Sequence, residues 1–289
     1  MTGIQIVAEQ GAWRGGFEER LLAAYREAGC SEPLALALRE RAVTGIDGWT
    51  LATDGTGWIA VEAAEDNGVV TGRIHDLTVP GGRAWAERWC AEQGARSVRV
   101  RLTGGAGAQP GTGAFADYPV RGQNRMRAVA ERPVLPPGLT VRRLREEEYA
   151  DWLAREEASY IADIVRAGAL TPQQARQKSD RDFAEQLPQG YRTPGHAFYA
   201  METGGVVIGT GWVNHGYLPG VTFGFSLEVH EEHRGRGHGR AAMAVGEWAT
   251  RQGGDEALMF NVFGGNEVAM GLYDSTGFAV LDEFRSIDL

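Results

Sequence analysis

One loop of the chain reads Leu227-Glu-Val-His-Glu-Glu-His-Arg-Gly-Arg-Gly-His-Gly-Arg240. The run before it, Val221–Val229, has the composition of a strand, whereas Arg240–Arg251 places apolar residues on one helical face. Glycines at alternate positions let the backbone turn sharply and direct several N–H groups inward. Together with the positive end of the following helix, these groups predict a cradle for phosphate oxygens.

The residues around this loop narrow the kind of phosphate site. Arg234, Arg236 and Arg240 can add charge-assisted contacts to an anion. Glycines at 235, 237 and 239 do not match the dinucleotide-binding spacing, and no Gly-Lys-Ser/Thr is present. Because the chain has 41 glycines, the indication comes from the strand, the helix and the arginines rather than from Gly-x-Gly alone.

A second motif follows one strand later. We expect a strand at Ala257–Val262, a short helix at Glu267–Ser275 capped by Asn266, and a last strand at Ala279–Ile287. Tyr273 lies on that short helix, where it is either a core aromatic or a functional phenol.

Three prolines in Glu131–Gly138 block both helix and central strand, so this segment predicts a linker at 133–137. It separates residues 1–132 from 138–289, and each side reads as a mixed α/β unit. In the second part we expect strands at His196–Met201 and Gly205–Val213, with a turn at His215–Gly220 before the next strand.

The two halves read as degenerate copies of one another. Leu77-Thr-Val79, Gly82-Arg-Ala84, a helix and a strand repeat the order seen around the glycine loop. Val79 and Gly82 are only 3 positions apart, whereas Val229 and Gly239 are 10 apart. The first copy therefore lacks the loop, and we expect it to bind no cofactor there.

Composition excludes several classes of protein. The 289 residues carry a net charge of −9, which disfavours a nucleic-acid binder and weakly favours a cationic substrate. We see no signal peptide and no apolar run long enough for a membrane helix, so we expect a cytoplasmic protein, a monomer or a homodimer. The two cysteines are too few for a disulfide scaffold and lack the spacing of a metal site. The histidines of the glycine loop have no cysteine and no supporting carboxylate pattern beside them, so we expect no metal site.

The glycine loop and the later motif together resemble the GCN5-related N-acetyltransferase (GNAT) family. Arg234-x-x-Gly237-x-Gly239 after Leu227-x-Val229 is similar to its coenzyme A signature, and Asn266 and Tyr273 stand in its second motif. The resemblance implies an α/β fold of two tandem GNAT-like domains, each a mixed, largely antiparallel sheet flanked by helices. The layout is similar to that of mycothiol synthases, with a degenerate N-terminal copy.

The resemblance also implies roles for particular residues. Acetyl-CoA is the expected co-substrate, the Val229 N–H would face its thioester carbonyl, and Tyr273 would protonate the departing sulfur. The residues expected to bind coenzyme A are Leu227, Val229, Arg234, Gly235, Arg236, Gly237, His238, Gly239, Arg240 and Asn266.

The general base is less clear, because Phe223 and Asn261 stand where many relatives carry a carboxylate. Glu228 and His215 are the two candidates, and a water chain or an amine of low pKa is the alternative. The acidic stretch from Glu146 to Asp163, which includes Glu156, is either a solvated helix face or a cation-attracting lip.

We therefore expect an enzyme that acetylates the primary amine of a small molecule, such as an amino sugar, a natural product or a metabolite. Two alternatives remain at this point. One is acetylation of a protein N-terminus or lysine, and the other is a coenzyme A-binding sensor or partner module without turnover.

Overall fold

The computed structural model describes residues 3–66, 68–105, 108–166 and 171–289. The chain forms two compact units, one of Met1–Arg127 together with Phe260–Leu289 and one of Ala128–Met259. The second unit begins close to the expected linker. The C-terminal segment differs from the expected boundaries, because it clusters with the first unit.

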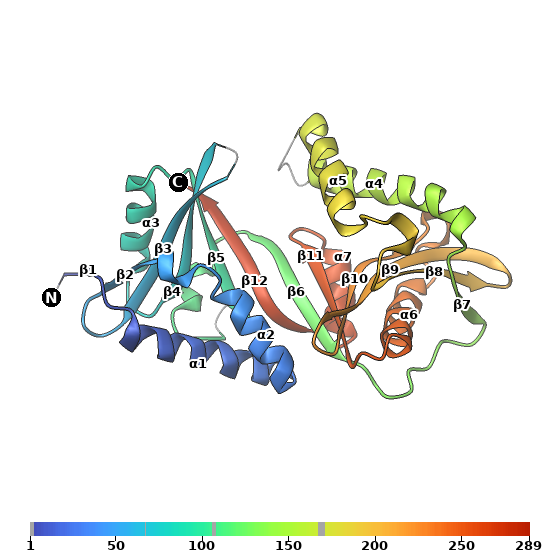
Figure 1. Ribbon diagram of the computed structural model, residues 1–289, viewed down its shortest axis with the longest axis horizontal. Helices are drawn as coiled ribbons and strands as arrows, with labels where there is room; N and C mark the ends of the chain where they lie inside the picture. The colour runs from blue at the N-terminus through green and yellow to red at the C-terminus, as the bar shows by residue number, and fades with distance from the viewer. Residues whose placement is uncertain (1–2, 67, 106–107, 167–170) are drawn as a thin grey trace. The chain divides into compact units, whose positions relative to one another are not determined.

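The first unit is a mixed sheet with helices. Its strand order is β1-β2-β3-β4-β5-β12-β6, in which only β4 and β5 are paired in parallel (Figure 1). Its elements are β1 (Gln5–Val7), α1 (Gly11–Glu27), α2 (Glu32–Ala42), β2 (Thr50–Thr53), β3 (Trp58–Asp66), β4 (Val69–Leu77), α3 (Arg83–Glu92), β5 (Ser97–Thr103), β6 (Val120–Ala128), α7 (Glu267–Ser275) and β12 (Ala279–Asp288).

The last strand of the chain completes the sheet of the first unit. Phe284 of β12 is paired with Arg101 of β5 on one side and with Gly122 of β6 on the other. Asp282 of β12 is buried and accepts hydrogen bonds from Arg101 Nε at 2.8 Å and from the Tyr25 hydroxyl at 3.1 Å. Residues from both ends of the chain therefore share one core.

The second unit has an antiparallel sheet in the order β10-β9-β8-β7. Its elements are β7 (Leu139–Arg143), α4 (Tyr149–Arg166), α5 (Pro172–Gln186), β8 (His196–Thr203), β9 (Val206–Leu218), β10 (Val221–Val229), α6 (His238–Gln252) and the start of β11 (Ala257–Phe263). The chain thus passes through the same order of elements twice, as β-α-α-β-β-β-α-β, which confirms the predicted internal repeat.

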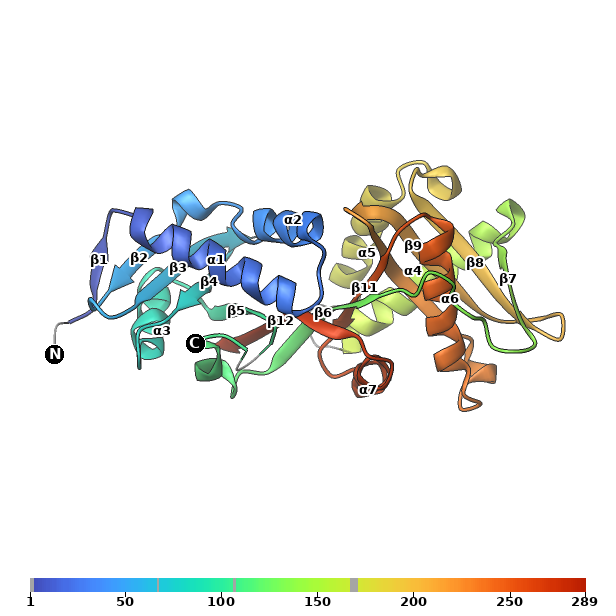
Figure 2. The ribbon, with the colours of Figure 1, turned by 90° about the horizontal axis from the view of Figure 1, so that it is seen from below.

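Helices cover both faces of this second sheet, α4 and α5 on one and α6 on the other (Figure 1 and Figure 2). The alternation of side chains along β8 explains the two layers. Phe198 packs with Trp152 of α4, whereas the next residue, Tyr199, packs with Ala249 of α6. Among the described residues, no helix has the length and apolar character that a membrane crossing requires.

The hairpin of β9 and β10 differs from the predicted one. The strand continues through Leu218 instead of ending at Val213, and the turn that was expected at His215–Gly220 shrinks to its last two residues. The reason is a bulge: Leu218 is paired with Val221 and Asn214 with Phe223, so three residues of β9 oppose one of β10. Local turn chemistry indicated the bend but not the bulge.

Candidate functional site

The predicted glycine loop leads from β10 into α6. After a short 3₁₀ turn at Glu231–His233, Gly235 and Gly237 adopt φ angles of 75° and 84°, in the left-handed region that favours glycine. Gly237 is the N-cap residue of α6 and has no side chain to cap the helix. The loop is largely exposed, so an anion has access to it.

The backbone N–H groups of this loop have few partners. Within the described residues, those of Gly235, Arg236 and Gly237 donate no hydrogen bond to the protein. The first N–H groups of α6 lack intrahelical acceptors, as in every α-helix, and they lie at the positive end of its dipole. This arrangement fits a bound diphosphate, whose oxygens would accept from these donors.

The three arginines of the loop are in different situations. Arg234 folds back onto β10, where Nε donates to the Val229 carbonyl at 2.9 Å and the guanidinium meets Glu228 at 2.7 Å. Arg236 and Arg240 are exposed and form no ion pair among the described residues. Arg236 and Arg240 can therefore turn toward an anion, whereas Arg234 anchors the loop to the strand.

A pocket of about 510 Å³ lies beside the loop within the second unit. Residues of α4, the sheet and the loop line it, including Trp152, Glu156, Glu228, His230 and Arg234. Seven carboxylates and three arginines border this space, which we call the acidic pocket. Its volume lies within the range of about 300–1,000 Å³ that is typical of small-molecule sites.

Glu156 is a functional candidate that the sequence analysis did not single out. Glu156 is only 9% exposed, and the Ser226 hydroxyl of β10 donates a hydrogen bond to Glu156 Oε1 at 2.8 Å. Burial raises the pKa of Glu156 to about 7, with a smaller increase from Glu228, while the Ser226 bond lowers it. The sequence holds one signal for it, because Glu156 lies one helical turn after Trp152 and thus on the same face of the helix.

The two expected base candidates occupy different places. Glu228 lines the acidic pocket, but its carboxylate is paired with Arg234. His215 lies near Gly253 at the opposite end of α6 and does not line the pocket. Its Nδ1 lies 2.9 Å from the Thr222 hydroxyl, and burial lowers the pKa of the ring. The structure therefore gives His215 a role in closing the hairpin and does not bring it to the loop.

The second motif lies in the first unit. Asn266 caps α7 as predicted, with Oδ1 accepting from the Ala269 N–H at 3.1 Å. Tyr273 packs against the rings of Phe260 and Phe278, and burial raises its pKa to about 12. The phenol is therefore protonated at neutral pH. Leu227 and Val229 pack with the apolar face of α6.

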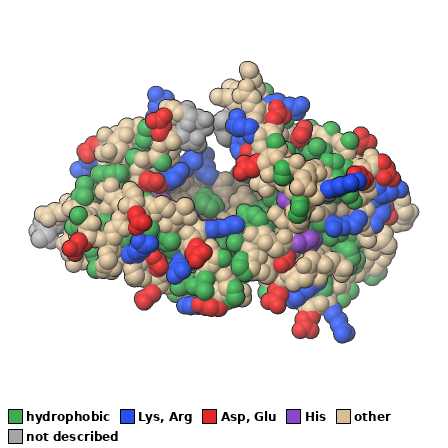
Figure 3. All heavy atoms as spheres, in the orientation of Figure 1, with side chains coloured by type: hydrophobic (Ala, Val, Ile, Leu, Met, Phe, Trp, Pro, Cys, Tyr) green, Lys and Arg blue, Asp and Glu red, His purple; other side chains and the backbone are tan. Residues whose placement is uncertain are grey.

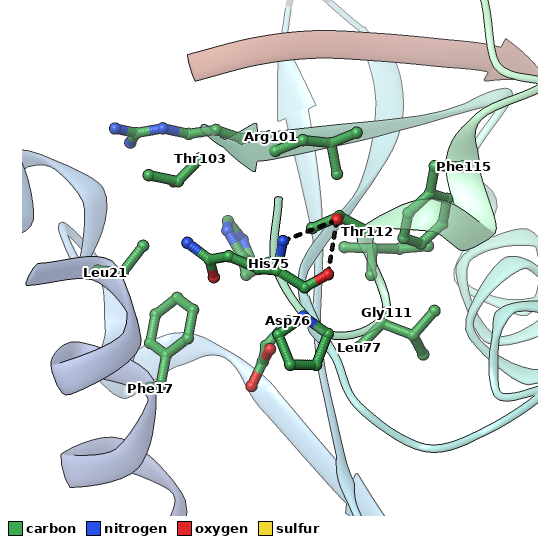
Figure 4. A pocket seen from close by; sticks show the side chains of 14 residues that line it. Phe17, Leu21, His75, Asp76, Leu77, Arg101, Thr103, Gly111, Thr112 and Phe115 are labelled. Atoms are coloured by element: carbon green, nitrogen blue, oxygen red, sulfur yellow. Dashed lines mark hydrogen bonds between the residues drawn. The ribbon is translucent and has the colours of Figure 1, made fainter. Parts of the chain in front are cut away.

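The first unit has no comparable loop in its described part. The connection from β4 to α3 is a short turn, in which the Gly82 N–H already donates to the Val79 carbonyl. Figure 4 shows the space between the ends of β4 and β5, where Gly111 and Thr112 lie next to Leu77. A cavity of only about 30 Å³ remains, and a Cβ at Gly111 would lie 1.6 Å from the Leu77 carbonyl oxygen. That the first copy binds no coenzyme A stays a prediction.

The surface shows mixed charge. Figure 3 shows acidic and basic side chains interspersed over the face that it presents. The described residues contain no group of three or more His, Cys, Asp or Glu side chains placed to hold a metal ion.

Comparison with known proteins agrees with the geometry. Residues 143–278 match the acetyltransferase (GNAT) family. The uncharacterized N-acetyltransferase YycN of Bacillus subtilis is 29% identical over 148 residues, which are 50% of this chain and 94% of YycN. The mycothiol acetyltransferase of Nocardiopsis dassonvillei is 31% identical over 202 residues, which are 67% of this chain and 56% of that protein.

A solved GCN5-related N-acetyltransferase of Sphaerobacter thermophilus shares the fold along the whole chain. It covers 99% of this chain and 98% of its own, with a TM-score of 0.53 and 16% identity. The fold is therefore that of a GCN5-related N-acetyltransferase. Residues 143–278 belong to the GNAT family of N-acetyltransferases, whose acyl donor is acetyl-CoA.

Proposed function

We propose that this enzyme transfers the acetyl group of acetyl-CoA to the primary amine of a small cationic molecule, such as an amino sugar, a natural product or a metabolite. One observation carries the proposal: the uncapped glycine loop and the acidic pocket lie side by side in the second unit, joined by Glu228 and Arg234. The loop suits the diphosphate of the donor, and the pocket suits a cationic acceptor.

Particular residues of the chain would supply the parts that acyl transfer requires. The loop amides with Arg236 and Arg240 would hold the diphosphate, and the Val229 N–H would polarise the thioester carbonyl. Asn266 would hold the pantetheine chain, and Tyr273 would donate a proton to the departing sulfur. Acetyl-CoA itself supplies the activated acyl group, whose thiol has an ordinary pKa of about 8.5 and leaves readily.

The size of the acidic pocket favours a small acceptor over a protein substrate. A protein N-terminus or lysine would bind along an extended surface, whereas the acidic pocket has a volume of about 510 Å³. Carboxylates exceed arginines in its lining, which favours an amine that arrives protonated.

Calorimetry and a turnover assay test the proposal. We expect the full chain to bind acetyl-CoA and to release thiol from it when a small diamine or amino sugar is added. Release only with peptides would indicate a protein acetyltransferase. Tight binding of acetyl-CoA without amine-dependent thiol release across the whole panel would indicate a binding module.

A further inference from the structure

We propose that Glu156 accepts the proton of the acceptor ammonium group, and that the acidic pocket thereby selects cationic amines. The inference rests on the proposed function and supplies the base that Phe223 and Asn261 cannot provide.

The position of Glu156 supports this role. The carboxylate lines the acidic pocket from α4, and its hydrogen bond to Ser226 holds it beside β10. Ser226 stands three residues before Val229, whose N–H would face the thioester in the proposed function. The proton acceptor and the acyl donor would therefore lie along the same strand.

One polar atom in the lining independently indicates a ligand. The Nε2 atom of His230 is buried and has no hydrogen-bond partner among the described residues. The indole N–H of the buried Trp152 instead interacts with the Glu156 carboxylate and lowers its pKa. Because buried polar atoms are nearly always hydrogen-bonded, the His230 atom points to a polar group of a molecule in the pocket.

The charges around Glu156 come from several elements. Glu228 of β10 disfavours its ionised form, whereas Arg155 of α4 favours it. The remaining charged or titratable residues of the lining lie on β7, on the 3₁₀ turn before α4, on α4 itself and after β10; they are Arg142, Glu147, Glu148, Asp151, His230, Glu231, Glu232 and Arg234. Glu148 is paired with Arg142, and Glu228 with Arg234. The excess of carboxylates favours a cation next to Glu156.

Each proton and each bond of the proposed transfer can be followed from the substrates to the products. The substrate ammonium group, with an ordinary pKa of about 10, gives one proton to the Glu156 carboxylate, and its nitrogen becomes nucleophilic. The nitrogen lone pair forms the C–N bond as the C–S bond breaks. Tyr273 protonates the departing sulfur, and the second proton of the nitrogen restores the Tyr273 hydroxyl. Glu156 then releases its proton to solvent. A pKa near neutrality suits this cycle, since the group must be ionised before the step and must give up the proton after it.

The test compares pH profiles of kcat/KM for a cationic amine in the wild type, Glu156→Gln, Ser226→Ala and the control Glu157→Gln. We expect the wild-type rate to fall tenfold per pH unit below about 7. Glu156→Gln should lose roughly 10²- to 10⁴-fold and no longer show that inflection. Ser226→Ala should move the inflection to higher pH, because the lost hydrogen bond favours the ionised form.

Two further measurements separate the possible failures. Calorimetry should show unchanged acetyl-CoA affinity in Glu156→Gln and weaker binding of the cationic amine, while Glu157→Gln matches the wild type in both. Full activity of Glu156→Gln with the inflection retained would overturn the role of Glu156 and leave the transferase intact. A wild-type protein that binds no acetyl-CoA would instead overturn the proposed function, and this inference with it.

Discussion

The burial of Glu156, and with it its candidacy as a functional residue, depends on the residues packed around it. In sequence it belongs to an acidic stretch that is compatible with a solvated helix face, and only the packing of Trp152 and Ser226 around it removes it from water. The helical spacing from Trp152 was available, but the sequence alone does not say which face of α4 meets the sheet. Glu228 could be expected near the loop, but its pairing with Arg234 could not.

The raised pKa of Glu156 has a consequence for stability that does not depend on turnover. The folded state binds this proton more tightly than the unfolded state, so stability falls as pH rises from about 4.5 to about 7. Glu156→Gln should therefore unfold at higher urea than the wild type at pH 8, by up to about 3 kcal/mol, but not at pH 4.5. Equal stability of the two proteins at both pH values would show that burial does not raise the pKa of Glu156.

Substitution of Tyr273 distinguishes a proton donor from a core aromatic residue. Tyr273→Phe keeps the ring contacts with Phe260 and Phe278 and removes only the hydroxyl. We expect kcat to fall about a hundredfold while acetyl-CoA affinity is retained, since the proton donor acts in the transition state. Stopped-flow thiol release measures this, and unchanged kcat would make Tyr273 a core aromatic.

At the scale of elements, the helices and strands that could be predicted are those whose ends and periodicity are marked by neighbouring residues in the sequence. The helix at Glu267–Ser275 and the strand at Val221–Val229 have the expected bounds, because caps, glycines and periodicity mark them. The bulge of β9 could not be predicted in this way, because pairing register depends on the partner strand. His215 is one of the three bulged residues of β9 and does not line the acidic pocket.

The loop between β10 and α6 is tested through Arg236, one of its two exposed arginines that form no ion pair among the described residues. Arg236→Ala should weaken acetyl-CoA binding by about 1.5–3 kcal/mol, the range for a lost charged hydrogen bond. Arg181→Ala on α5 is a matched control, because this arginine is also exposed but lies outside the loop. Calorimetry at low and high salt should show the difference shrinking with salt. Equal affinity of Arg236→Ala and wild type would remove Arg236 from the site.

At the scale of the whole molecule, the second unit begins at Ala128, close to the proline segment, but that segment does not indicate where the last strand belongs. Proline blocks local structure, which sequence shows directly, whereas the pairing of β12 with β5 and β6 joins residues far apart in the chain. No local pattern in Ala279–Asp288 specifies those partners.

The role of β12 leads to a prediction about fragments. Residues 1–132 alone lack the strand between β5 and β6 and the carboxylate of Asp282, which leaves Arg101 without its acidic partner. We expect this fragment to show no cooperative urea transition, and Asp282→Ala in the full chain to cost about 3–5 kcal/mol. A cooperative fragment as stable as the intact protein would show that the first unit does not need the C-terminal strand.

The most direct test of the account is the affinity of the full chain for acetyl-CoA against acetyl-pantetheine, which lacks the diphosphate. If loop amides and arginines hold that diphosphate, acetyl-CoA should bind at least about a hundredfold more tightly, and Arg236→Ala should reduce the ratio. Equal affinity for the two compounds would contradict the account, because the donor would then be held without the glycine loop.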